Sequence, residues 1–257
     1  MRKNRMMRAA SALLVAVLLT TSTISGTFAK YVTEASGSDT ARVAKWGVEV
    51  AGMADPLFTN QYKDENSDSG FEYTVIAVDD VVAPGTANTD GVTFRLTGKP
   101  EVATKVEFKV YRSDDVANKE AAPTDVVLPS GTYIDYTKAP YTDTFTIGAD
   151  YHPVRFTLRD ANNGNIIGGL EKVTLADIEA YLEGSNMSKN FEANTNLAEI
   201  AGVGNSGIYV LTWEWIFDGD DKADTLLGNI AADSGYGVSG ASINLDFAIA
   251  IIATQID

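Results

Sequence analysis

Apolar and polar side chains alternate along several stretches of this chain, and this feature restricts the fold more than any other. In residues 103–111, Val106, Phe108 and Val110 alternate with charged side chains. A period of two places successive side chains on opposite faces of an extended strand. The segment therefore predicts a β-strand with one face in the core and the other in water.

The same pattern occurs elsewhere, in segments separated by loops rich in Gly, Pro, Asn and Asp. It places Trp46 and Val48 on the core side of one strand, and Ile243 and Phe247 on one side of another. Strands are predicted at 41–50, 71–78, 92–96, 103–111, 125–128, 131–137, 142–147, 153–159, 208–217 and 241–254.

One segment carries helical signals instead. Thr174 and Asp177 match a capping box, an apolar stripe follows, and Gly184 supplies a C-terminal stop. A weaker helical turn is predicted at 196–201. Together these patterns predict an all-β fold, a two-sheet, jelly-roll-like β-sandwich with a short helical insertion near 174–201.

The N-terminus resembles an export signal. A basic start precedes an apolar run at 9–19, which is shorter than the roughly 20 residues that span a membrane. Small residues then lead to a predicted cleavage site after Ala29, and the alternative is an uncleaved signal anchor. The expected organisation is a signal peptide at 1–29, a free N-terminal segment at 30–42 and one β-sandwich domain at 43–257.

Charge and cysteine content narrow the function further. The chain carries 20 basic and 35 acidic residues and a net charge of −15. Loss of the signal would remove four positive charges and no negative ones. So acidic a surface disfavours nucleic acid and anionic membranes as partners. No cysteine is present, which excludes thiol catalysis and cysteine-based zinc sites.

The chain offers few candidate catalytic residues. His152 is the single histidine, and the chain has neither an H-E-x-x-H zinc motif nor a G-x-S-x-G nucleophile elbow. A hydrolase that uses His152 is kept as a minor alternative. We therefore expect a protein that is not an enzyme and needs no cofactor.

Two other clusters leave alternatives open. The acidic segment near residue 220 is read either as a solvated loop or as a weak calcium site, with Lys222 in its midst. Its four carboxylates belong to Asp218, Asp220, Asp221 and Asp224. Trp213 and Trp215 share one face of a strand. They either pack in the core or form a stacking surface for sugars, as in a monomeric, secreted or cell-surface carbohydrate-binding module.

Short motifs near both ends of the chain resemble the TasA/camelysin family of exported proteins. The matching segments, in order, are 26–31, 47–50, 82–85, 92–96, 103–111, 242–247 and 253–255. Residues 112–204 show no such resemblance. Some members of the family are labelled metalloproteases, which the lone His152 does not support.

The resemblance implies a jelly-roll β-sandwich, processing by a SipW-type signal peptidase, and a secreted protein of biofilm-matrix fibres. Such fibres can grow when a freed N-terminal strand adds to the next copy. The expected donor consists of Lys30, Tyr31, Val32, Thr33, Glu34 and Ala35. The partner is then the protein itself, together with a possible minor anchoring or nucleating subunit. The alternative is a disordered tail.

Overall fold

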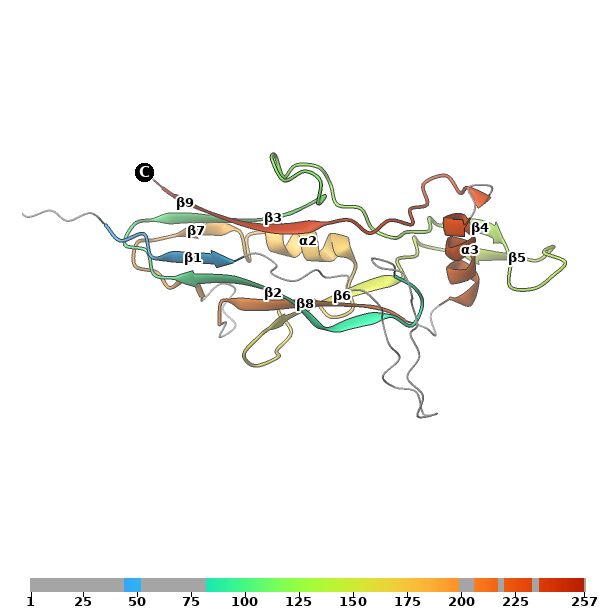
Figure 1. Ribbon diagram of the computed structural model, residues 1–257, viewed down its shortest axis with the longest axis horizontal. Helices are drawn as coiled ribbons and strands as arrows, with labels where there is room; N and C mark the ends of the chain where they lie inside the picture. Colours follow the sequence, from blue (N-terminus) through green and yellow to red (C-terminus); the bar gives the residue numbers. More distant parts are fainter. Residues whose placement is uncertain (1–43, 52–81, 199–205, 217–219, 233–235, 257) are drawn as a thin grey trace, which may run out of the picture. The chain divides into compact units, whose positions relative to one another are not determined.

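A computed structural model describes residues 44–51, 82–198, 206–216, 220–232 and 236–256 of the 257-residue chain. Two helices and nine strands are described (Figure 1). The strands are β1 (Val48–Ala51), β2 (Ala87–Gly98), β3 (Thr104–Tyr111), β4 (Gly131–Ile134), β5 (Thr144–Ile147), β6 (Val154–Asp160), β7 (Lys189–Phe191), β8 (Ile208–Trp215) and β9 (Ala248–Gln255). The helices are α2 (Leu175–Glu183) and α3 (Asp221–Ala232).

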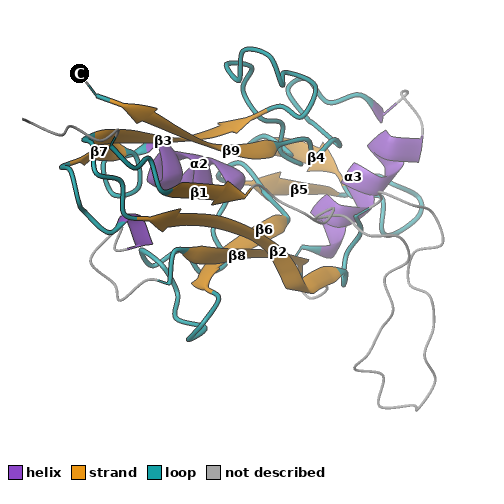
Figure 2. Cartoon of the chain, turned by 60° about the vertical axis from the view of Figure 1, so that its left-hand side comes forward, coloured by secondary structure: helices purple, strands orange, loops and turns teal. Residues whose placement is uncertain are grey.

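The strands form an antiparallel sandwich, which confirms the predicted all-β fold with a helical insertion. One sheet has the order β1-β2-β8-β6 and the other the order β7-β3-β9 (Figure 2). Among the described strands, β4 and β5 pair only with each other, as a separate hairpin. Because β2 and β3 belong to different sheets, the short connection between them crosses from one layer to the other.

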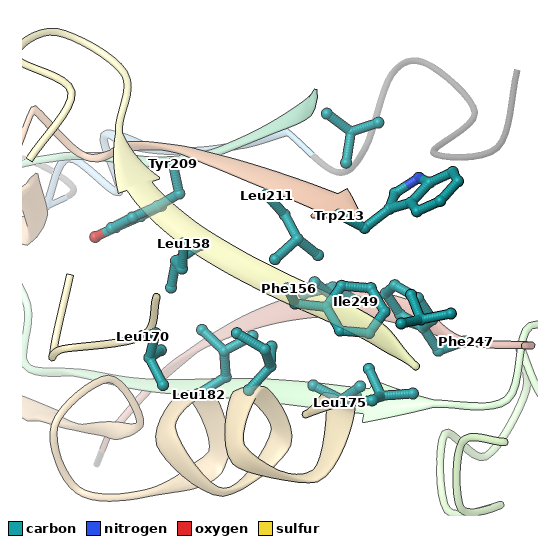
Figure 3. Packing of buried hydrophobic residues seen from close by; sticks show 14 of the residues in the cluster. Phe156, Leu158, Leu170, Leu175, Leu182, Tyr209, Leu211, Trp213, Phe247 and Ile249 are labelled. Carbon is teal, nitrogen blue, oxygen red and sulfur yellow. The ribbon is translucent and has the colours of Figure 1, made fainter. Parts of the chain in front are cut away.

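Inward-facing side chains of both sheets form one hydrophobic core. Phe94 of β2 stacks on Tyr209 of β8 with ring centroids 5.1 Å apart, and Phe108 of β3 meets each ring edge-on at 6.3 Å. These contacts join the two sheets. Figure 3 shows the part of the core where side chains of β6 and β8 meet those of α2 and β9.

Helix α2 closes one side of the sandwich. Its capping box is formed as predicted: Thr174 accepts a hydrogen bond from the Asp177 backbone N–H, and the Asp177 side chain accepts from the Thr174 N–H. Gly184 is the C-cap. The helix buries Leu175, Ile178 and Leu182 and packs against β3 and β6. Its apolar stripe therefore belongs to the core of the sandwich.

The first predicted strand is shorter than expected, and its tryptophan is not in the core. Gly47 has a φ of +52°, which interrupts the extended backbone, so that β1 begins at Val48. Val48 packs against the core as expected, but Trp46 lies before the strand and 39% of its surface is exposed. The prediction for Trp46 was therefore wrong.

The acidic segment near residue 220 contains the start of a helix, where a loop was predicted. Asp220 caps α3, because its side chain accepts hydrogen bonds from the N–H groups of Lys222 and Ala223 at 3.2 Å each. Ala223, Leu226 and Leu227 then form a buried helical stripe. Asp224 is also buried in that stripe. Because an acidic residue stands at this buried position, the sequence does not show the regular apolar spacing that predicts a helix.

Two further strand predictions need correction. Residues 241–247 form only isolated bridges, Val127 with Ser242 and Thr124 with Asp246, so regular pairing begins at Ala248. Ile243 is exposed and Phe247 is buried, although the alternation placed both on one side of the predicted strand. Residues 125–128 likewise form isolated bridges in place of a strand. The strand predicted at 71–78 lies outside the described residues.

Candidate assembly edge

The edges of the two sheets differ in how their backbone groups are paired, and this difference defines a candidate site. An unpaired strand edge can add a strand from another chain, so proteins usually cover their edges. The outer edge of β6 is covered by the chain that follows it. Phe156 and Val173 exchange backbone hydrogen bonds, and Leu158 donates to Leu170 at 3.0 Å.

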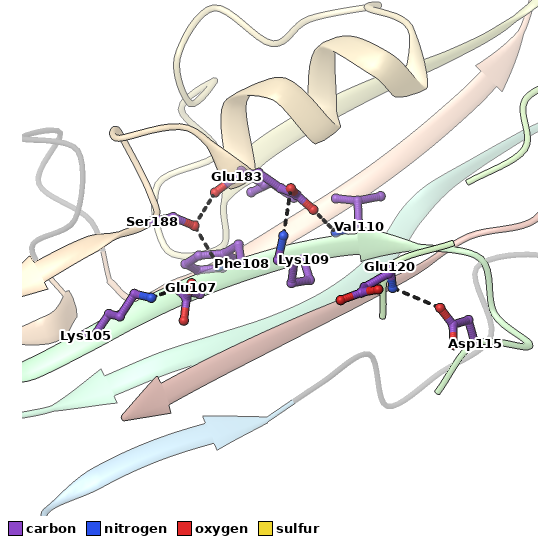
Figure 4. A network of polar contacts seen from close by, with 10 residues as sticks. Lys105, Glu107, Phe108, Lys109, Val110, Asp115, Glu120, Glu183 and Ser188 are labelled. Carbon is purple, nitrogen blue, oxygen red and sulfur yellow. Dashed lines mark hydrogen bonds and ion pairs between the residues drawn. The ribbon is translucent and has the colours of Figure 1, made fainter. Parts of the chain in front are cut away.

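The outer edge of β3 is covered in two ways (Figure 4). Its first residues pair with the short strand β7. Beyond β7, side chains take over: the Phe108 N–H donates to the Ser188 hydroxyl at 2.7 Å, and the Val110 N–H donates to Glu183 at 3.0 Å. Lys109 adds an ion pair with Glu183 at 3.2 Å. The end of α2 thus occupies the place of a neighbouring strand.

The outer edge of β9 has no such cover among the described residues. Of the strands described, only β3 pairs with β9, and the Ile256 N–H donates to the Ala103 carbonyl. Because hydrogen-bonded pairs alternate along an antiparallel ladder, the backbone groups of every second residue of β9 face away from β3. These residues are Ile249, Ile251, Ala253 and Gln255.

The composition of β9 suits strand addition. Its eight residues, AIAIIATQ, contain no charge and no proline, which are the usual protections of an exposed edge. Ile252 is 37% exposed on the outward face of the strand. Strand β1, the edge of the other sheet, approaches β9 and exposes Val50. The described part of the chain therefore presents apolar surface on the side away from α2.

Sequence reasoning identified neither the covered edges nor the open one. The uncharged run of β9 was visible as a signal, but a buried central strand has the same composition. The roles of Glu183 and Ser188 had no local signal, because their partners in β3 lie more than 70 residues away. The predicted cleavage site at Ala29 and the donor residues 30–35 lie outside the described residues.

The predicted calcium ligands are only partly described, and those that are described do not converge. Asp220 caps α3, and Asp218 lies outside the described residues. Asp224 turns inward, where one carboxylate oxygen accepts hydrogen bonds from the Tyr151 hydroxyl at 2.9 Å and the Trp215 indole at 3.1 Å. Burial raises the pKa of Asp224. Within the described ranges, no three acidic or histidine side chains form a group that could hold a metal ion.

Both tryptophans of β8 lie in the core. Trp213 is 2% exposed and Trp215 is 6% exposed. Their rings pack with the other inward-facing residues of β8. Neither offers a ring face to solvent, so the sugar-stacking surface predicted as an alternative is not formed by these two residues.

His152 has a carboxylate partner. Its Nδ1 lies 2.9 Å from a carboxylate oxygen of Asp125. Burial raises the pKa of Asp125, and the contact with His152 opposes part of this rise. Among the described residues, no serine or threonine hydroxyl is hydrogen-bonded to the ring. The described contacts therefore tie the start of β6 to the neighbouring segment and do not assemble a Ser-His-Asp triad around His152.

Comparison with protein-family models, with curated proteins and with solved structures gave no match. Of the helices described, neither is long and apolar enough to cross a membrane. Function is therefore inferred from the geometry of the sandwich and from the motifs near the ends of the chain.

Proposed function

We propose that this protein is an exported, non-enzymatic structural protein that assembles head to tail into extracellular fibres. In this proposal, a signal peptidase of the SipW type frees the N-terminus, and residues 30–35 of one copy add as a strand to the outer edge of β9 in the next. The expected location is the cell surface or the biofilm matrix. A minor anchoring or nucleating subunit is a further expected partner.

The observation that carries the proposal is the asymmetry of the sandwich. Side chains and short segments cover the outer edges of β3 and β6, whereas the outer edge of β9 has no backbone partner among the described residues. Strand addition would pair its free N–H and C=O groups and bury Ile252. The resemblance of the terminal motifs to the TasA/camelysin family supports the same assignment.

The proposed donor has a length that suits this edge. The eight residues of β9 span about 26 Å, and the six donor residues, 30–35, span about 20 Å as a strand. The donor can therefore pair along most of the edge. Residues 36–43 remain as a connection to its own domain and reach about 26 Å when fully extended.

Its chemistry also fits. Tyr31 and Thr33 alternate with Lys30 and Val32, so that one face can bury Tyr31 against the sandwich while the other remains accessible. Contact between a terminal segment and a distant edge is heterologous. Such a contact gives an open filament unless the rotation closes a ring.

Electron microscopy of two purified proteins tests the proposal. One begins at Lys30 and the other at Arg42, which removes the donor and leaves every described residue in place. Filaments from the first protein and monomers from the second are expected. Monomers from both, at high concentration and with calcium added, would overturn the proposal.

A matched pair of substitutions tests the acceptor. Ile252→Lys places a charge on the outward face of β9, and Val116→Lys places the same charge at an exposed position of the 112–121 loop. Both variants should fold with the circular dichroism and thermal midpoint of the parent. Only Ile252→Lys should stop fibre growth, and equal growth by both variants would exclude β9 as the acceptor.

The chain has no cysteine, so introduced cysteines can form disulfides only with each other. Such disulfides distinguish a donor strand that pairs with β9 of another copy from one that pairs with β9 of its own copy. Val32→Cys and Ala250→Cys, on separate proteins that are mixed and oxidised, should yield a covalent dimer. The same two changes in one chain should yield a ladder of oligomers. Cross-linked monomer alone would show that the segment covers its own edge and would contradict fibre assembly by this route.

A further inference from the structure

A groove of about 320 Å³ lies over β6 and β8, on the outward face of their sheet. We name it the β6 groove. The alternation of β6 produces it, because Phe156 and Leu158 are buried in the core and the residues that alternate with them face outward. The groove shares no residue with β9. The lining residues that bear on its chemistry are Arg155, Thr157, Arg159, Lys172, Thr212 and Glu214.

The β6 groove gathers positive charge in a chain that has 20 basic and 35 acidic residues. Two carboxylates also line it, but both already have partners. Asp160 is 1% exposed and accepts hydrogen bonds from the backbone N–H groups of Asn162 and Ser206. Glu214 is paired with the Lys172 ammonium at 2.8 Å. The two arginines are therefore the charges that a ligand would meet.

Arg155 has no close partner within the described ranges. It forms no hydrogen bond or ion pair there, because Glu214, its neighbour across the ladder on β8, pairs with Lys172 instead. Asp125 and Asp177 interact with its charge at longer range. A guanidinium group presents N–H donors in a fork that matches the two oxygens of a carboxylate. Arg155 therefore keeps these donors available to an incoming oxyanion.

Arg159 supplies the second guanidinium group, and its own contacts are weak. It lies 3.9 Å from Glu171 and donates a hydrogen bond to the Gly164 carbonyl at 3.3 Å. A partly exposed ion pair of this kind contributes little. Arg159 follows Arg155 by four positions on the same side of β6, which places their Cα atoms about 13 Å apart. Thr157 lies between them, and its short side chain leaves room for a ligand.

We propose that the β6 groove binds an acidic saccharide, with one carboxylate on Arg155 and another on Arg159. Two parallel hydrogen bonds from a guanidinium group hold each carboxylate. The Thr212 hydroxyl can accept a hydrogen bond from a hydroxyl group of the sugar. Recognition is by charge and not by ring stacking, and it does not depend on fibre assembly.

The groove suits a saccharide better than an acidic peptide. A peptide gains much of its affinity by pairing its backbone with an open strand edge. The outer edge of β6 is already covered, because Phe156 pairs with Val173 and Leu158 donates to Leu170. The other neighbour of β6 in the sheet is β8. A ligand that offers hydroxyl groups and carboxylates needs no such edge.

Calorimetric titration of the purified mature protein with three short oligomers tests the chemistry. Trigalacturonate carries carboxylates on sugar rings, maltotriose has neutral sugar rings, and triglutamate carries carboxylates on a peptide. Trigalacturonate should bind at least about tenfold tighter than maltotriose, because hydrogen bonds to charged groups are lost with the neutral sugar. It should also bind tighter than triglutamate. No binding of trigalacturonate, equal affinity for maltotriose, or equal or higher affinity for triglutamate would overturn the proposal.

Three variants test the location. Arg155→Gln and Arg159→Gln should each weaken trigalacturonate binding about tenfold. Arg95→Gln is the matched control, because Arg95 is exposed on the same face of the sheet, between the buried residues Phe94 and Leu96, and does not line the groove. It should leave binding unchanged. A thermal midpoint close to that of the parent shows that each variant is folded. Equal weakening by all three would mean that only the overall charge attracts the ligand, and would overturn the site.

Discussion

Glu183, the last residue of α2, accepts a hydrogen bond from the backbone N–H of Val110 at 3.0 Å. This contact joins a helix end to a strand edge that would otherwise be free to pair with another chain. Ser188 does the same for Phe108. One side of the sandwich is therefore closed by side chains, whereas the edge of β9 has no backbone partner among the described residues.

Removing this cap should destabilise the fold. Glu183→Ala leaves the N–H of the buried residue Val110 without its acceptor, which costs about 1–3 kcal/mol in the free energy of unfolding. Glu183→Gln keeps an acceptor and loses only the partly exposed ion pair with Lys109, which is worth about 0.2–1 kcal/mol. Urea denaturation measures both values. Equal losses for the two variants would show that the hydrogen bond to Val110 contributes little.

Two single proline substitutions in β9 should have different effects, because one affects the edge that pairs with β3 and the other affects the outer edge. The N–H of Thr254 faces β3 and that of Ala253 faces outward, so only Thr254→Pro removes a ladder hydrogen bond. Thr254→Pro should lower the free energy of unfolding by about 1 kcal/mol more than Ala253→Pro. In seeded fibre-growth assays, Ala253→Pro should still block assembly, because it removes a donor from the acceptor edge. Growth of Ala253→Pro at the parental rate would be inconsistent with strand addition there.

Acid should weaken the contact between Asp135 and the start of α3. Hydrogen bonds from Thr137 and the Lys222 ammonium lower the pKa of Asp135 to about 2, from an ordinary value near 4. A depressed folded-state pKa contributes stability that is fully present above pH 4 and is lost as the pH falls towards 2. Denaturation midpoints measured from pH 5 to pH 2 should fall less steeply for Asp135→Asn than for the parent. Parallel curves would contradict this assignment.

His152 and Asp125 should be energetically coupled, so that the effects of their substitutions on the free energy of unfolding are not additive. His152→Ala leaves a largely buried carboxylate with one partner fewer and should cost about 1–3 kcal/mol. Asp125→Ala in addition should cost less than the sum of the two single changes, because the orphaned charge is then gone. Chemical denaturation of the four proteins measures the difference. Additive losses would mean that the two side chains are not energetically coupled.

Local patterns were sufficient for much of the sandwich. Alternation in β3 and β8 correctly predicted which side chains face the core, because a period of two depends only on strand geometry. The capping box of α2 was likewise readable from Thr174 and Asp177. These signals lie within a few residues of each other, and they operate before any long-range contact is made.

Local patterns failed where a distant contact decides the outcome. Asp224 looked like a solvated acid, but it is buried in α3 because Tyr151 and Trp215 donate hydrogen bonds to it. Trp46 looked like a core residue, but the left-handed conformation of Gly47 interrupts the strand that would have carried it inward. In each case, the deciding feature has no regular period in the sequence.

The sequence by itself determined the β-rich class, the position of α2 and the inward faces of the main strands, because these follow from side-chain periodicity. Only the tertiary structure decided which edges are covered. Glu183 and Ser188 reach β3 from segments more than 70 residues away, and β9 pairs with β3 alone among the described residues. Pairing of backbone groups depends on which segments meet in space, and a backbone N–H has the same chemistry at either edge of a strand.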